Sequence, residues 1–125
     1  MNDREKGIQQ FREMIPASVW DPGASLPEGT FAPELSELAL TNVYGRLWTR
    51  EGLDRRARSL LTLGILIALR AGDQLKINFM AALQNGLTRE ELEEVIYHAT
   101  GYAGFPAATE AAGIAAEVLG QYGKA

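Results

Sequence analysis

The sequence predicts an all-α, single-domain helical bundle, and three observations support this fold class. Apolar residues recur at helical spacing from Pro33 onward, no segment alternates like a strand between turn residues, and capping residues separate the periodic segments. A chain of 125 residues has room for one core. We expect a short helix and a Pro/Gly-rich arm over residues 1–30, followed by the helical domain over residues 31–125.

The N-terminal region predicts one short helix before an extended arm. Within Asp3–Ile15, the residues Ile8 and Phe11 share one helical face with the last residue of the segment. Four of the five prolines lie within Pro16–Pro33, together with two glycines. Because proline and glycine punctuate regular structure, this stretch is predicted to be an arm without helix or strand.

The helix predicted after Asp54 is apolar on nearly all faces. A helix over Pro33–Arg50 precedes it, Gly52 separates the two, and Asp54 is a suitable N-cap. The apolar residues of the later helix, which runs to about Arg70, are Leu60, Leu61, Leu63, Ile65, Leu66, Ile67 and Leu69. A small domain has little interior to cover such a helix, so we expect burial between subunits of a homo-oligomer.

Residues typical of helix termini predict three further helices. The first begins at Asp73 and ends at the turn Asn85-Gly86, which is typical of a left-handed C-terminal cap. Thr88 and Glu91 form a capping box for the next helix. The last helix begins near Pro106 and is rich in alanine, which predicts close packing against its neighbours.

Composition and charge exclude several classes of function. The chain has no Cys and one His, so thiol chemistry, disulfides and a His-rich metal site are excluded. A net charge of −4 argues against binding nucleic acid or an anionic membrane. The charged N-terminal residues do not fit a signal peptide, and the longest apolar run is too short to span a bilayer. We therefore expect a cytoplasmic protein.

Five of the nine arginines lie between Arg46 and Arg58. Arg55, Arg56 and Arg58 occupy the first turn of the apolar helix, where cations oppose the helix dipole. One interpretation is a binding site for a carboxylate, which arginine can hold with two hydrogen bonds. The other is neutralisation by Glu51 and Asp54, or by an acidic neighbouring subunit.

Four polar residues in the later helical segments are candidates for chemistry. Glu94, His98 and Tyr102 follow one another at intervals of four residues and share a helix stripe. A carboxylate beside an imidazole can orient it as a general acid or base, although a surface pair has the same spacing. Asn78 is an uncharged amide on an amphipathic helix, where it can donate to a ligand oxygen or face solvent.

Three segments occur in a fixed order from about Phe31 to Leu119. They are Leu47–Leu60 (LWTREGLDRRARSL), Asn85–Glu91 (NGLTREE) and Tyr102–Ala108 (YAGFPAA). Together they resemble the carboxymuconolactone decarboxylase family. The resemblance implies an all-α fold of the carboxymuconolactone decarboxylase and alkylhydroperoxidase type, assembled into rings that are commonly hexamers built as trimers of dimers.

The two branches of this family predict different chemistries. One branch reduces peroxides with a Cys-x-x-Cys pair and a following His, whose positions fall here at about Ala71, Gln74 and Asn78. The chain is therefore not expected to be a cysteine peroxidase. The other branch decarboxylates 4-carboxymuconolactone in aromatic compound catabolism without a metal or organic cofactor. This branch implies a cofactor-free lyase for a small carboxylated or lactone-like compound, acting through an enolate-type intermediate.

The segment Ile77–Met80 departs from the pattern of the decarboxylase branch. The family's Leu-His-Leu-Arg is replaced there, with Asn78 at the His and Met80 at the Arg. The loss of the arginine suggests a less anionic substrate, and the reaction can be an isomerisation or ring-opening through the same enolate. Some decarboxylases have Gln and others His at the position of His98.

The resemblance implies a single, largely apolar pocket near Arg58, Asn78 and His98. We expect His98, oriented by Glu94, to transfer a proton and Asn78 to stabilise a developing oxyanion. The substrate-binding residues expected beside them are Arg58, Arg55, Trp48 and Met80, with Trp48 or a neighbouring subunit closing the pocket. No metal ligands are expected, and the partners expected are a small-molecule substrate and further copies of the chain. The alternative is a non-catalytic, ring-forming ligand-binding or assembly protein of the same fold.

Overall fold

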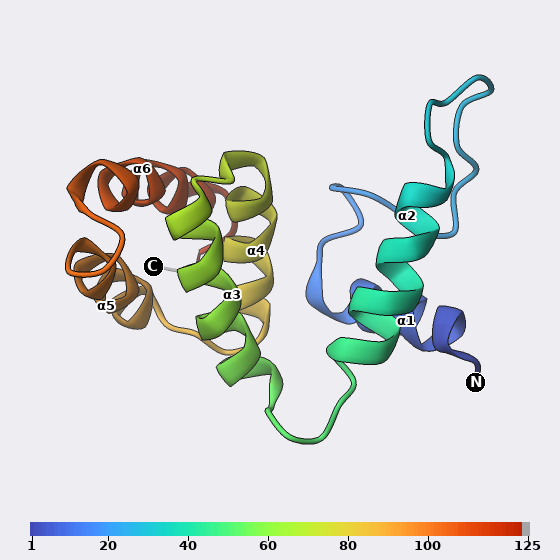
Figure 1. Cartoon of the computed structure of the whole chain (residues 1–125), viewed down its shortest axis with the longest axis horizontal. Helices are drawn as coiled ribbons and strands as arrows, with labels where there is room; N and C mark the ends of the chain where they lie inside the picture. The colour runs from blue at the N-terminus through green and yellow to red at the C-terminus, as the bar shows by residue number, and fades with distance from the viewer. Residues whose placement is uncertain (124–125) are drawn as a thin grey trace. The chain divides into compact units, whose positions relative to one another are not determined.

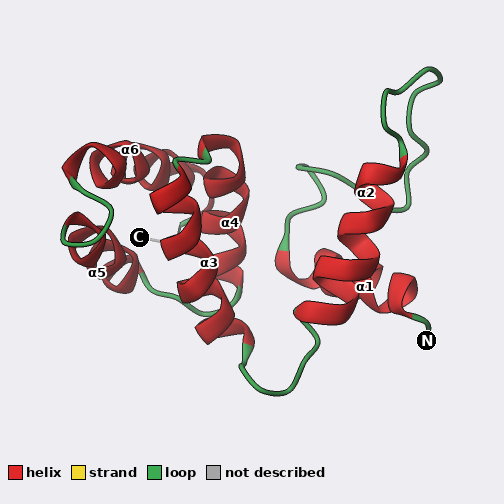
Figure 2. Ribbon diagram, viewed as in Figure 1, coloured by secondary structure: helices red, strands yellow, loops and turns green. Residues whose placement is uncertain are grey.

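A computed structural model describes residues 1–123, and all regular structure in that range is helical (Figures 1 and 2). The all-α prediction is confirmed for these residues. They form two compact units, one over Met1–Leu53 and one that begins at Asp54. The sequence predicted a short helix and arm over residues 1–30 and a helical domain over residues 31–125, and by contact the described residues divide after Leu53. The segment 39–47 packs on the N-terminal helix and so belongs to the first unit.

The first unit is built on the crossing of two helices. Helix α1 (Asp3–Met14) packs against the π-helix η1 (Ala39–Leu47), which continues from the short helix α2 (Glu34–Leu38). The sequence predicted a continuous helix here but not its bonding, in which the Trp48 N–H donates to the Val43 carbonyl at 3.0 Å. Apolar spacing indicates which face is buried, and it does not fix which carbonyl each N–H reaches.

Two glycines allow the backbones of α1 and η1 to touch. A Cβ on Gly7 would overlap the Leu40 carbonyl, and a Cβ on Gly45 would overlap the Asp3 carbonyl. Around this crossing, the Phe11 ring contacts Tyr44 and Trp20 edge-on at 5.1 Å and 5.2 Å. Trp20 lies in the Pro/Gly-rich arm, so the arm is anchored on α1 although it contains no helix or strand, as predicted.

The second unit contains four helices: α3 (Arg55–Leu69), α4 (Gly72–Gln84), α5 (Arg89–Thr100) and α6 (Phe105–Tyr122). Helix α4 packs on α3 and α6, while α5 packs on α6 and α3. The fully buried large side chains of this unit are Leu63, Ile67, Leu75, Phe79, Leu92 and Val118. Small residues let α6 approach closely, since Ala108, Ala111 and Ala115 are also buried.

Three of the predicted helix termini are confirmed by their hydrogen bonds, whereas α4 begins at Gly72 without the side-chain cap expected at Asp73. Asp54 Oδ1 accepts from the Ala57 N–H at 2.8 Å and begins α3. Gly86 has φ +97° after α4, and the Leu87 N–H returns to the Ala82 carbonyl at 3.0 Å, which closes a Schellman turn. Thr88 caps α5 as half of a capping box.

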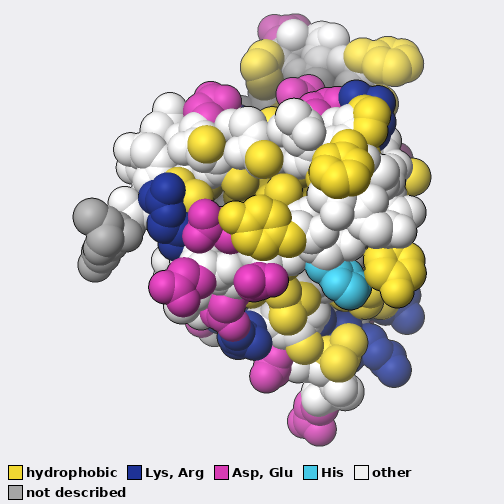
Figure 3. All heavy atoms as spheres, turned by 90° about the vertical axis from the view of Figure 1, so that its left-hand side faces the viewer, with side chains coloured by type: hydrophobic (Ala, Val, Ile, Leu, Met, Phe, Trp, Pro, Cys, Tyr) yellow, Lys and Arg dark blue, Asp and Glu magenta, His cyan; other side chains and the backbone are white. Residues whose placement is uncertain are grey.

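Helix α3 buries only one of its apolar faces within the chain. Leu63 and Ile67 are fully buried, whereas Leu61, Ile65 and Leu69 are 56%, 50% and 70% exposed. Figure 3 shows further hydrophobic side chains at the surface on the side of α5 and α6, with the histidine among them. Within the described residues, no helix is both long and apolar enough to cross a membrane.

The close contact of α1 and η1 at Gly7 predicts that a larger residue there lowers the stability of the first unit. The substitution Gly7→Ala should destabilise this unit by about 3 kcal/mol, because the methyl group meets backbone that cannot rotate away. Both tryptophans of the chain, Trp20 and Trp48, lie in this unit, so thermal unfolding followed by tryptophan fluorescence measures it.

The matched control is Gly52→Ala, because a Cβ at Gly52 would meet no atom within 4 Å. Its effect on the same transition should stay below about 1 kcal/mol. Equal unfolding curves for the two variants would contradict the packing described for α1 and η1.

Candidate functional site

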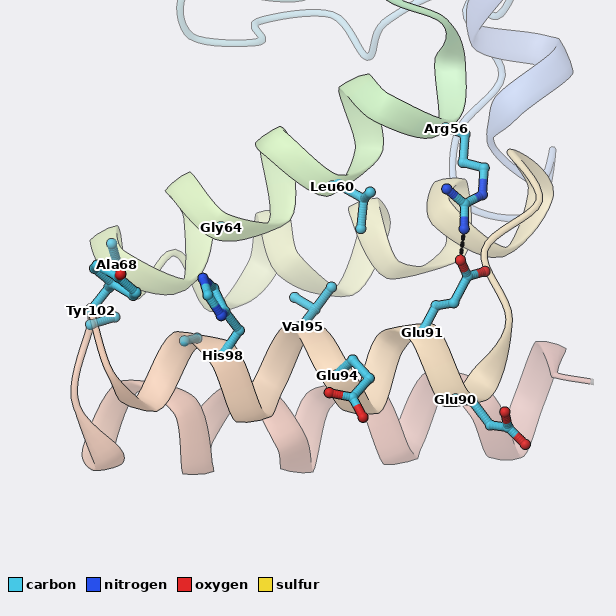
Figure 4. A pocket seen from close by; sticks show the side chains of 12 residues that line it. Arg56, Leu60, Gly64, Ala68, Glu90, Glu91, Glu94, Val95, His98 and Tyr102 are labelled. Atoms are coloured by element: carbon cyan, nitrogen blue, oxygen red, sulfur yellow. Dashed lines mark ion pairs between the residues drawn. The ribbon is translucent and has the colours of Figure 1, made fainter.

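An open groove of about 820 Å³ lies between α3 and α5 in the second unit (Figure 4). Its floor and walls come from one face of each helix and from the loop that leads to α6. The lining residues are Arg56, Leu60, Gly64 and Ala68 from α3, Glu90, Glu91, Glu94, Val95, His98 and Ala99 from α5, and Tyr102 and Ala103 from the loop. The site is formed by α3 and α5, and these helices pack against α4 and α6.

The α3 side of the groove is a stripe with a spacing of four residues. Arg56 stands at one end, and Leu60, Gly64 and Ala68 follow along the same face. A Cβ at Gly64 would meet no atom within 4 Å, so the groove is open at this position. The small residues Gly64 and Ala68 leave the surface in front of α5 hollow.

The α5 side presents the single histidine of the chain. The His98 imidazole is exposed and points from α5 toward α3 near Gly64, as Figure 4 shows. Its ring lies 5.1 Å from the Tyr102 ring, with the planes tilted by 33°. Val95 forms the apolar wall on the other side of His98. An imidazole between an apolar wall and an aromatic ring can contact a small molecule bound in the groove.

Glu94 lines the same groove, so the structure brings two of the predicted site residues together. Within the described residues, however, no hydrogen bond joins the Glu94 carboxylate to the His98 imidazole. Figure 4 shows the carboxylate turned away from α3, while the imidazole points toward it. The spacing of four residues placed both side chains on one stripe, but it did not determine their rotamers.

Arg56 at the end of the groove forms an ion pair with Glu91 of α5. The sequence identified the cations at the start of α3 and proposed Glu51 and Asp54 as neutralising partners. For Arg56 the partner is instead Glu91, which lies on another helix. Glu91 is also the second half of the capping box, because its Oε1 accepts from the Thr88 N–H at 3.0 Å.

A second contact beside this ion pair joins the same two regions. The buried Ser59 hydroxyl accepts from the Asn85 side-chain amide at 2.9 Å. We call this contact and the Arg56–Glu91 pair the α3 junction. It links the segments Leu47–Leu60 and Asn85–Glu91, which the sequence had singled out separately. Side chains of the two segments therefore meet in space.

The remaining predicted site residues lie outside the groove. Arg55 and Arg58 are half-buried in the first turn of α3, and neither lines it. Asn78 of α4 is half-buried and its amide donates to the Gln74 carbonyl at 2.8 Å, while Met80 is buried. Trp48 is buried in the first unit. The structure does not bring Arg58 and Asn78 into the groove that contains His98.

Arg56 is the cation that lines the groove, and the sequence pointed to it without assigning it to the site. The signal that could have selected it is its spacing of four residues from Leu60 and of eight from Gly64. Among residues 1–123, no three His, Asp or Glu side chains are grouped so that they could hold a metal ion.

The sequence model of the carboxymuconolactone decarboxylase family matches residues 33–117. The match covers more than half of the chain, and three recognisable segments fall within it. The chain belongs to the carboxymuconolactone decarboxylase family. This confirms the resemblance found in the sequence.

Two named relatives show what this chain is similar to. The 4-carboxymuconolactone decarboxylase of Acinetobacter baylyi is 43% identical over 80 residues, which are 64% of this chain and 60% of that protein. The nitrosuccinic acid decarboxylase of Metarhizium robertsii is 43% identical over 107 residues, which are 86% of this chain and 74% of that protein. The alignment thus spans about three-fifths of the Acinetobacter protein and about three-quarters of the Metarhizium protein.

The α3 junction predicts energetic coupling between Ser59 and Asn85. Each single substitution, Ser59→Ala or Asn85→Ala, should cost about 1–2 kcal/mol of unfolding free energy because it leaves a partner without its hydrogen bond. The double variant should lose about 1 kcal/mol less than the sum, as measured by urea unfolding.

The control cycle pairs Ser59→Ala with Asn78→Ala, since the Asn78 amide donates within its own helix. These two effects should add within about 0.5 kcal/mol. Additivity in both cycles would contradict the coupling at the junction.

Proposed function

We propose that this chain is a decarboxylase of small carboxylic acids that works in the α3–α5 groove without a metal or organic cofactor. The observation that carries the proposal is the exposed His98 imidazole, which points into a groove with apolar walls. Both named relatives are decarboxylases by name. Each name describes an acid that carries an electron-withdrawing group. This group is a lactone in one acid and a nitro group in the other.

The reaction needs a site that accepts negative charge on oxygen and returns a proton to carbon. The bond between the carboxylate carbon and the neighbouring carbon breaks, carbon dioxide leaves, and the electron pair moves onto the oxygen of the electron-withdrawing group. A proton from the His98 imidazolium then forms the new C–H bond. The apolar walls formed by Leu60 and Val95 desolvate the compact carboxylate more than the delocalised anion, which favours the step.

The other predicted site residues stay predictions in this proposal. Glu94 lines the groove beside His98, and orienting the imidazole would require its carboxylate to turn toward α3. A ligand would have to lie outside the groove for Asn78 to act as oxyanion donor with Met80 beside it. The same holds for anion binding by Arg58 and Arg55. The proposal therefore assigns the proton transfer to His98 alone.

The exposed apolar face of α3 supports the further proposal that the chain forms a homo-oligomer, expected to be a hexamer arranged as a trimer of dimers. Leu61, Ile65 and Leu69 leave a continuous apolar strip uncovered within one chain. Burying a leucine or isoleucine side chain contributes about 1.5–3 kcal/mol, so covering this strip stabilises an assembly.

The assembly is tested by light scattering at micromolar concentration. The wild type should give a mass that is a multiple of 13.6 kDa, and Ile65→Glu should shift it toward the single chain because a charge is placed in an apolar contact. Glu93→Gln, an exposed substitution on α5, serves as the control. A wild-type mass of one chain would contradict the proposal.

The proton-transfer role is tested with 4-carboxymuconolactone and nitrosuccinate as substrates, followed by ultraviolet absorbance. His98→Ala should lower kcat by about 10²-fold or more and change KM less, as expected for the loss of a general acid. Tyr97→Ala is the matched control, since Tyr97 is an exposed ring on α5 that does not line the groove.

Two results would contradict this function. His98→Ala with full activity would remove His98 from the mechanism. Binding of both compounds by the wild type without turnover would favour the alternative of a non-catalytic ligand-binding or assembly protein, which the replacements at Asn78 and Met80 already suggest.

A further inference from the structure

A partly exposed ion pair lies at the end of the groove opposite Tyr102. Arg56 and Glu91 form the ion pair there, and both side chains line the groove. Their side chains remain 46% and 34% exposed, respectively. A partly exposed pair contributes little net stability, so a competing anion can separate it.

Glu91 does not depend on Arg56 for its position. Its other carboxylate oxygen accepts from the Thr88 N–H, and the Thr88 hydroxyl accepts from the Glu91 N–H at 3.1 Å. A negative charge in the first turn of α5 also complements the helix dipole. Glu91 therefore stays satisfied when Arg56 moves away, and the guanidinium is the member of the pair that can change partner.

The pair differs in this respect from Arg4 and Glu37 in the first unit. Arg4 donates to both carboxylate oxygens of Glu37, at 2.6 Å and 2.9 Å, whereas the Thr88 N–H holds one of the two oxygens of Glu91. When Arg56 leaves Glu91, that oxygen keeps its hydrogen bond within the protein.

Between the pair and the imidazole, the groove is lined by the apolar Leu60 and Val95 and by Glu90 and Glu94, whose carboxylates Figure 4 shows turned away from α3. Glu91 and His98 are seven residues apart on α5, which is about 10 Å along the helix axis. Arg56 and Leu60 are neighbours on the α3 stripe, so a turn of the long Arg56 side chain into the groove would shorten this gap. A short molecule with a carboxylate at one end and its reacting carbon near His98 would then span from the guanidinium to the imidazole.

We propose that Arg56 is the carboxylate-binding residue of this groove and that it exchanges Glu91 for the carboxylate which a short dicarboxylic acid retains. The assignment rests on the proposed function for the location of the site. It makes Arg56 and Glu91 a pair that sets specificity, because a ligand without a second carboxylate cannot replace Glu91. The bidentate geometry of guanidinium and carboxylate suits this exchange.

Binding of succinate, measured by isothermal titration calorimetry, tests the proposal without requiring turnover. The wild type should bind succinate saturably, and Arg56→Gln should weaken the binding by about tenfold or more, as for the loss of charge-assisted hydrogen bonds. Glu91→Gln should strengthen it about three- to fivefold, because Arg56 is released while an amide oxygen still accepts from the Thr88 N–H.

Two charge-matched controls separate specific binding from the change in net charge. Arg89→Gln and Glu93→Gln alter exposed charges on α5 that do not line the groove, and both should leave succinate affinity within experimental error. Succinamide, the neutral analogue, should not distinguish any of the variants. If Arg56→Gln does not fold, the opposite change expected for Glu91→Gln decides the question.

The outcomes separate this inference from the proposed function. The predicted affinities together with no decarboxylation would support the Arg56 site and overturn the decarboxylase proposal. Loss of activity in His98→Ala with unchanged succinate affinity in both Arg56→Gln and Glu91→Gln would overturn the Arg56 site alone. Absence of saturable succinate binding to the wild type, or equal effects of the control substitutions, would also overturn it.

Discussion

The groove depends on the α3 junction, where the first turn of α3 is tied to the start of α5. Ser59 accepts a hydrogen bond from Asn85, and Arg56 pairs with Glu91, so two contacts fix one helix to the turn before the other. Both helices line the groove from this point. Helix α4 packs on α3, and α6 packs on α5. The width of the groove farther along is set by Gly64 and by the loop that contains Tyr102.

The elements of the second unit could be predicted from the sequence because their signals are local. An N-cap, a capping box and a glycine after a helix each act on neighbouring backbone groups, and Asp54, Thr88 and Gly86 all do so in the structure. The division of the chain could not be predicted in the same way. It depends on the contact of Gly7 with the backbone around Leu40, two positions that are far apart in the sequence.

The candidate site was predicted only in part because helix phase decides which side chain enters a groove. Arg56 and Arg58 are two residues apart, which is about 200° around the helix, so they face different sides of α3. Asn78 lies on α4, which packs against α3 and α6, whereas the groove lies between α3 and α5. His98 and Glu94 were predicted because both belong to α5, where a spacing of four residues is sufficient to place them together.

The central claim is that ligands bind in the groove at His98, and nuclear magnetic resonance tests it most directly. The chain has one histidine, so the imidazole signals of uniformly labelled protein belong to His98 without further assignment. During titration with nitrosuccinate, the signals of His98 and of the Arg56 guanidinium should shift together, and the Asn78 side-chain amide should not. Shifts confined to Asn78 and Arg58, with an unchanged His98, would contradict the account and place the ligand outside the groove.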